Sequence, residues 1–187
     1  MINIFLLSFI ATLLFSPIGT ILKKRKEYDK DNLQYFSEIL IYGLLFVSFI
    51  SLALNFFTPL TKTINSTIFV ISLFMLYQYR KLFFNTKYLI FLIITSFIVW
   101  LLLVKSNTFR PDAGLYHLPY ISILNNEKII FGLSNLHYRF GHISIIQYTS
   151  AFFNNLFFST NGIVFPAALI YASVLINFIT RIMFYLK

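Results

Sequence analysis

The sequence predicts an all-α protein, a polytopic membrane helix bundle with about five transmembrane helices. Three observations predict this class. Hydrophobic residues make up 58% of the chain, and charged residues make up only 11%, whereas soluble globular proteins carry about 25% charged residues. The apolar residues also gather in separate segments of the length that a membrane-spanning helix needs. The expected spans are residues 2–22, 35–57, 64–79, 88–104 and 163–185.

The spans differ in how clearly the sequence marks them. Residues 35–57 and 88–104 are long apolar runs, while residues 64–79 are short but bounded by charge. Residues 2–22 lack the positive n-region of a secretory signal peptide, because their charges follow the apolar run instead of preceding it. We therefore expect a retained first helix within a single membrane domain over residues 1–187.

The basic residues between the spans predict the orientation. Ten of the fifteen Lys and Arg residues fall on one side if every span crosses once: Lys23, Lys24, Arg25, Lys26, Lys30, Arg80, Lys81, Lys87, Arg181 and Lys187. By the positive-inside rule this side is cytoplasmic. We therefore expect a multi-pass protein of the cell (inner) membrane, with its N-terminus and residues 106–160 on the non-cytoplasmic side.

The net charge of +9 does not indicate nucleic acid, because basic residues scattered between apolar spans are typical of cytoplasmic flanks. The expected surroundings are membrane lipids. Cysteine is absent, which excludes disulfides and thiolate metal sites. Glu38 stands at the inner end of the second span, where a neighbour could neutralise it; buried in the bundle, it would be a functional candidate.

Residues 106–160 form the external loop and differ in kind from the rest of the chain. All three histidines lie in it, together with Asp112 and Glu127, the only acidic residues on that side. A loop of this length is usually functional or disordered, and its aromatic residues and apolar periodicity argue against disorder. The loop is therefore the place to look for chemistry.

Two short helices are expected within the loop. Leu118-Pro119 can begin a helix that runs to about Asn125, because proline in the first turn loses no helical hydrogen bond. Residues 143–158 place apolar side chains three and four apart, with Gln147 and other polar residues on the opposite face. This pattern predicts an amphipathic helix that lies along the membrane interface.

The loop residues are suited to transfer from a lipid phosphate. Asp112 follows Arg110-Pro111 at the membrane boundary, where desolvation would raise the basicity of its carboxylate. Arg110, Arg139 and the histidines are natural ligands for phosphate. A simpler interpretation is that Asp112 only caps the next turn or pairs with Arg110. Asp112, His117, His137 and His142 could also form a metal set, but no tight motif such as H-E-x-x-H is present, and we predict no metal site and no cofactor.

Two motifs then carry a family resemblance. Asp112-Ala-Gly-Leu-Tyr-His-Leu-Pro119 and Gly132-Leu-Ser-Asn-Leu-His-Tyr-Arg139 resemble a group of bacterial polytopic membrane proteins that carry D-x-G-L-Y-H and G-L-x-N-L-H-x-R signatures. That group is similar to the GT-C superfamily of glycosyltransferases, which includes the protein O-mannosyltransferases and the aminoarabinose transferase of lipid A.

The resemblance implies roles for particular residues. Asp112 would be the acidic catalytic residue, and the donor would be a polyprenyl-phosphate-linked sugar. The residues expected to bind substrate are Arg110, Tyr116, His117, Asn135, His137 and Arg139. The chain would then transfer a sugar to an acceptor of the cell envelope. Because such enzymes are much longer, the resemblance also implies that residues 1–187 form the N-terminal part of a larger protein. The competing hypothesis is a non-enzymatic membrane subunit whose loop binds a partner or a lipid head group.

The orientation is testable by cysteine labelling. We expect Ser134→Cys to react with an impermeant thiol reagent in intact cells and Lys24→Cys to react only after permeabilisation, because the wild-type chain has no cysteine and the basic side faces inward. The reverse pattern would reject the orientation and, with it, an external active site.

Overall fold

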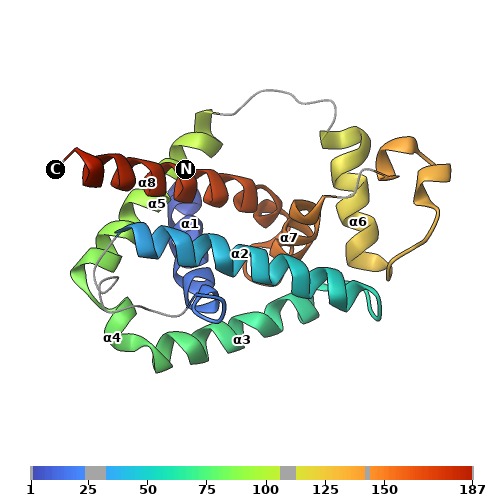
Figure 1. Cartoon of the computed structure of the whole chain (residues 1–187). Coiled ribbons are helices and arrows are strands. Elements are labelled where there is room, and N and C mark those ends of the chain that lie inside the picture. The colour runs from blue at the N-terminus through green and yellow to red at the C-terminus, as the bar shows by residue number, and fades with distance from the viewer. Residues whose placement is uncertain (1, 24–32, 106–112, 142–143, 187) are drawn as a thin grey trace. The chain divides into compact units, whose positions relative to one another are not determined.

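The computed structural model describes residues 2–23, 33–105, 113–141 and 144–186, and within these ranges it is helical without any strand (Figure 1). The chain divides into two compact units. Unit 1 consists of Met1–Phe46, Ile68–Ser106 and Ala167–Lys187, and unit 2 consists of Val47–Thr67 and Asn107–Pro166. Unit 1 holds most of the long apolar helices, and unit 2 holds the loop with the two motifs.

Five helices coincide with the five apolar segments that the sequence marks, which confirms the all-α prediction. They are α1 Ile2–Gly19, α2 Leu33–Asn55, α3 Lys62–Gln78, α5 Thr86–Lys105 and α8 Phe165–Tyr185. Among the described residues, three helical segments are both long and apolar enough to cross a membrane, namely Leu33–Asn55, Thr86–Lys105 and Ser159–Tyr185. The first helix is a shorter apolar one.

The outer surface of unit 1 is compatible with a membrane protein. Large apolar side chains stand exposed along its helices, among them Val70 on α3 at 69%, Phe74 on α3 at 66% and Phe178 on α8 at 62%. A soluble monomer rarely exposes contiguous apolar surface on this scale. In a bilayer the same side chains would contact acyl chains at no cost.

The interior of unit 1 combines aromatic packing with hydroxyl groups that bond to backbone carbonyls. The Phe36 ring lies 5.0 Å from that of Tyr88 and 5.9 Å from that of Phe91. On α1, the Thr12 hydroxyl donates to Ser8 O at 2.9 Å, and the Ser16 hydroxyl donates to Thr12 O at 2.7 Å. Such internal bonds let small polar residues lie between apolar helices without an unsatisfied group.

α1 and α2 approach so closely that glycine is required on both helices. A Cβ atom on Gly43 would lie 2.1 Å from Phe15 O, and one on Gly19 would lie 1.7 Å from Ile39 O. Small residues at a helix crossing allow this approach, as is common between membrane helices. The contact therefore depends on two particular residues.

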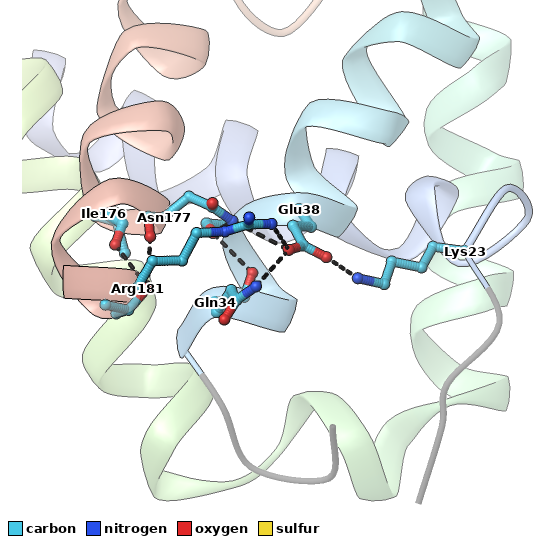
Figure 2. Close-up of polar contacts among 8 residues, drawn as sticks. Lys23, Gln34, Glu38, Ile176, Asn177 and Arg181 are labelled. Carbon is cyan, nitrogen blue, oxygen red and sulfur yellow. Dashed lines mark hydrogen bonds and ion pairs between the residues drawn. The ribbon is translucent and has the colours of Figure 1, made fainter. Parts of the chain in front are cut away.

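Glu38 binds the ends of three helices together (Figure 2). Its carboxylate forms an ion pair with Lys23, which follows α1, and accepts a hydrogen bond from Arg181 Nη2 on α8 at 3.3 Å. Gln34 Nε2 and Asn177 Nδ2 also donate to it, at 2.8 Å and 3.3 Å. The structure thus confirms that neighbours neutralise Glu38, which is only 15% exposed at its side chain.

Unit 2 has its own apolar core around two short helices, α6 Leu118–Asn126 and α7 Ile145–Phe153. The core residues are Leu60, Tyr120, Ile121, Leu124, Leu133, Tyr148 and Ala151. α6 begins with proline in its first turn, as expected for residues 118–125. Ser48 near the end of α2 contacts Thr149 on α7 through their hydroxyl groups.

The helix expected over residues 143–158 is shorter and more enclosed than the sequence predicts. α7 ends at Phe153, and both of its faces are covered: Gln147 on the polar side is buried, as are Thr149 and Phe152 on the predicted apolar side. Exposed apolar residues follow only after the helix, at Leu156 and Phe157. Tertiary packing explains the difference, because polar residues that bond within unit 2 need not face water.

The glycine contact between α1 and α2 predicts a specific loss of stability. Gly43→Ala should lower the free energy of unfolding by about 1–3 kcal/mol, because its methyl group overlaps a backbone carbonyl that cannot rotate away. Gly114→Ala is the matched control, since nothing lies within 4 Å of its Cβ position. Thermal unfolding in detergent measures both variants. Equal melting temperatures would contradict the close approach.

Candidate functional site

The two sequence motifs of the loop meet in unit 2. In the first, residues Ala113–His117 form a π-helical turn that continues directly into α6. The second contains the short 3-10 turns Leu133–Asn135 and Tyr138–Gly141. The Arg139 guanidinium lies over the Tyr116 ring, 4.7 Å from its centroid. A cation over an aromatic face is attractive, so this contact joins residues that are far apart in the sequence.

Arg139 is held in place by its own motif as well. Its Nε–H donates to the Tyr138 hydroxyl at 2.9 Å, and its backbone N–H donates to His137 Nδ1 at 3.3 Å. Because Nδ1 of His137 accepts this bond, the neutral ring carries its proton on Nε2. His137 therefore has a donor available on the side away from the backbone.

His117 is oriented by α7. Gln147 Oε1 accepts the Ser144 backbone N–H at 3.0 Å, which turns the amide nitrogen of Gln147 toward His117 Nδ1 at 3.4 Å. The same ring lies against Tyr116, with 4.2 Å between centroids. Nδ1 is thus the accepting nitrogen here too, and Nε2 bears the proton of the neutral ring.

The structure therefore brings together four of the predicted binding residues: Tyr116, His117, His137 and Arg139. Asn135 lies in the neighbouring turn with an exposed side chain. Its Nδ2 would be 3.3 Å from a Cβ atom on Gly132, whose φ of 82° already favours glycine. Arg110 and Asp112 lie outside the described residues, so their predicted roles stay predictions.

No three His, Asp or Glu side chains gather into a metal-binding group within the part of the chain that the structure describes. Asp112 and His142, which belong to the metal set weighed from the sequence, fall outside that part. The prediction that no metal is bound is therefore not tested by the geometry.

Tyr120 packs beside the end of the second motif and adds an uncharged hydroxyl group there. Burial raises the pKa of Tyr120 well above its usual range, and the adjacent Tyr148 raises it further. Its ring packs on Phe140, with 5.9 Å between centroids. The hydroxyl consequently stays protonated at every physiological pH.

Asparagines form a network in unit 2 that the sequence analysis missed. Asn65 Nδ2 donates to Leu60 O at 2.8 Å, Ala151 O at 3.0 Å and Asn154 O at 3.1 Å. Asn125 Nδ2 donates to the same Leu60 and Ala151 carbonyls, at 2.8 Å and 2.9 Å. Asn154 Nδ2 in turn donates to Asn125 Oδ1 at 2.8 Å. The network links the end of α7 with α6, with Leu60 and with the first turn of α3.

A groove of about 680 Å³ runs beside this network within unit 2. Most of the side chains that line it are polar, and one of them, Lys62, is cationic. Its lining consists of Thr61, Lys62, Leu118, Ile121, Ser122, Asn125, Asn126, Asn154, Thr160 and Ile163. No spacing signal in the sequence predicts it, because its residues come from three separate segments.

The sequence model of one family, described as a domain of unknown function (DUF8201), matches residues 1–186. The chain belongs to the DUF8201 family. The match runs through both units, so this DUF8201 domain includes the apolar helices as well as the two loop motifs. No curated protein and no solved structure matches the chain.

The contact between the motifs of this DUF8201 chain predicts a local change in protease sensitivity. Tyr116→Leu should increase tryptic cleavage after Arg139 about two- to fivefold, because it removes a ring worth about 0.5–1 kcal/mol to the guanidinium. Tyr116→Phe keeps the ring and should cleave like the wild type. Quantitative mass spectrometry of the Arg139 peptide measures the effect, and equal rates in the two variants would show that the ring does not hold Arg139.

Proposed function

We propose that this DUF8201 chain is a membrane glycosyltransferase-like protein that transfers a sugar from a polyprenyl-phosphate donor to a cell-envelope acceptor. One observation carries the proposal: the second motif folds back on the first, so that Arg139 lies over Tyr116, four residues after Asp112 in the chain. The Arg139 guanidinium therefore lies against the segment that follows Asp112 in the chain. His117 and His137, whose rings are oriented by hydrogen bonds, belong to the same two motifs.

The proposed orientation draws support from unit 1. The end of α1, the start of α2 and the last part of α8 all meet at Glu38, and the Phe36–Tyr88 contact places the start of α5 beside the start of α2. Helices that cross alternately would have these ends at one membrane surface. Arg80, Lys81 and Lys87 precede or begin α5, so the proposed surface is basic and cytoplasmic.

Five crossings follow from this arrangement as part of the proposal. α1 with 18 residues and α3 with 17 would span about 25–27 Å at 1.5 Å per residue, slightly less than the hydrocarbon thickness of about 30 Å. A locally thinner bilayer or the polar residues at their ends would accommodate the difference. Both motifs would then face the non-cytoplasmic side.

The proposed reaction is a displacement at the anomeric carbon of the donor sugar. The Asp112 carboxylate takes the proton of the acceptor hydroxyl, and the acceptor oxygen forms a bond to the anomeric carbon. The bond between that carbon and the phosphate oxygen breaks, and its electron pair leaves with the polyprenyl phosphate. Arg139 and the Nε2–H groups of His117 and His137 would stabilise the phosphate charge.

The runner-up function is a non-enzymatic membrane subunit whose loop binds a partner or a lipid head group. One observation favours it: apolar side chains of unit 2 near the motifs are strongly exposed, including Leu115, Phe131 and Leu136. Exposed apolar groups around a polar centre are typical of interaction surfaces. An activity assay separates the two functions.

The assay follows transfer from radiolabelled polyprenyl-phosphate sugars into envelope material, in membranes that express the complete gene. Asp112→Asn should lower the rate by about 10²–10⁴, because the amide keeps the size of the side chain but cannot accept the proton. Arg139→Gln should weaken use of the donor, because it removes a phosphate ligand. Both variants should reach the membrane at the wild-type level.

Glu127→Gln is the matched control, because Glu127 is the other acidic residue of the loop and its side chain is exposed. A loss of transfer with Glu127→Gln but not with Asp112→Asn would show that the catalytic residue is wrongly assigned. Wild-type transfer in all three variants would support the subunit function instead.

A further inference from the structure

We propose that the bend between α3 and α4 is a binding site for an anionic phospholipid, with Arg80 and Lys81 as the ligands of its phosphate. α4, Arg80–Phe83, is a single short turn that links α3 to α5 in unit 1 (Figure 1). The site depends on a bilayer around unit 1 and not on the transferase activity.

The bend is held rigid from the inside. Tyr79, with φ −99° and ψ 25°, breaks the helix between α3 and α4. Leu82 and Phe83 are each only 3% exposed, and the Phe83 ring meets the Tyr88 ring edge-on with 4.9 Å between centroids. Because these two side chains point into unit 1, Arg80 and Lys81 on the same short turn are left on its outer surface.

Two hollows meet at these cations. The first has a volume of about 500 Å³ and is almost entirely apolar apart from the cations, with a lining of Leu73, Leu76, Tyr77, Arg80, Lys81 and Phe84. The second has a volume of about 320 Å³ and a more polar lining of Tyr77, Gln78, Tyr79, Arg80, Lys81 and Leu82. Tyr77, Arg80 and Lys81 belong to both.

This pairing of an apolar and a polar hollow fits an amphiphile better than a soluble ion. An acyl chain would occupy the hollow beside Leu73 and Phe84, which is 75% exposed, and the head group would occupy the hollow beside Gln78 and Tyr79. The phosphate would lie between them. The Arg80 guanidinium stacks on the Tyr77 ring at 5.0 Å from the centroid. This contact holds Arg80 at the place where the two hollows meet.

The positive charge of Arg80 and Lys81 favours an anionic lipid over a zwitterionic one. Neither Arg80 nor Lys81 forms an ion pair with a carboxylate of the described residues, where Glu38 is taken by Lys23 and Arg181. Two adjacent cations at the level of lipid head groups attract anionic lipids, each by a factor of about five. A zwitterionic lipid would offer the same acyl chain but no net charge.

The test uses quenching of a single tryptophan by brominated lipids. Phe84→Trp in a Trp100→Phe background places the reporter in the apolar hollow, because Trp100 is the only natural tryptophan. The protein is reconstituted in vesicles that contain brominated phosphatidylglycerol or brominated phosphatidylcholine at equal mole fraction. The brominated phosphatidylglycerol should bind beside this reporter at least about fivefold more strongly than the brominated phosphatidylcholine.

Variants then assign the preference to the two cations. Arg80→Gln combined with Lys81→Gln should reduce it to near unity, and Lys81→Gln alone should reduce it partially. Lys87→Gln is the matched control, because Lys87 is a nearby basic residue that lines neither hollow, and it should keep the preference. High salt should weaken the wild-type preference, since at about 1 M ionic strength charges are screened beyond about 3 Å.

Equal quenching by the two lipids in the reporter protein would overturn the proposal. A preference that survives the double substitution would overturn it as well, because it would then come from basic residues elsewhere. If the double variant does not elute from size exclusion like the wild type, Lys81→Gln and the salt series decide, since Lys81 is exposed and its replacement leaves the stacking of Arg80 on Tyr77 in place.

Discussion

The end of α7 is the point on which the geometry of unit 2 depends. A helix end leaves carbonyl groups without partners, and here these carbonyls are buried. Ala151 O accepts the Asn154 backbone N–H at 3.2 Å. The Asn65 and Asn125 amides also donate to Ala151 O, and both donate as well to the buried Leu60 O, which precedes α3. Each buried carbonyl left without a donor would cost about 1–3 kcal/mol. The bonds therefore hold α7, α6 and the segment before α3 in one arrangement.

The positions of α6 and α7 in this network also determine the geometry of the candidate site. With the end of α7 bonded to α6, the start of α7 places Gln147 beside His117, and Leu133 and Tyr148 join the same apolar core. Phe140 then packs on Tyr120, which brings the turn with Arg139 over the first motif. The two motifs are thus positioned by residues outside both of them.

Unit 1 is held together differently, because its helices are mostly apolar and one carboxylate joins their ends. Glu38 does this through Lys23 and Arg181, and the Gly19–Gly43 approach brings α1 against α2. A carboxylate left alone in apolar surroundings would be costly, so the cations at the ends of α1 and α8 must lie at its level. The ion pairs of Glu38 therefore set the positions of α1, α2 and α8 along one another, and the two glycines set the distance between α1 and α2.

The sequence by itself determined the positions of the five long helices and of α6, because hydropathy runs and a proline in the first turn act locally along the chain. It also determined that Tyr116, His117, His137 and Arg139 belong to two motifs of one loop, whereas for Glu38 it left an interfacial position and a neutralising neighbour both open. Only the tertiary structure decided which residues meet. α7 ends five residues earlier than its apolar periodicity predicts, and Gln147 of its polar face is buried, because hydrogen bonds within unit 2 replace water. The asparagine network and the groove beside it could not be predicted from the sequence. Asn65, Asn125 and Asn154 belong to three separate segments, and only folding brings Asn65 and Asn125 to the same backbone carbonyls and Asn154 to the Asn125 side chain.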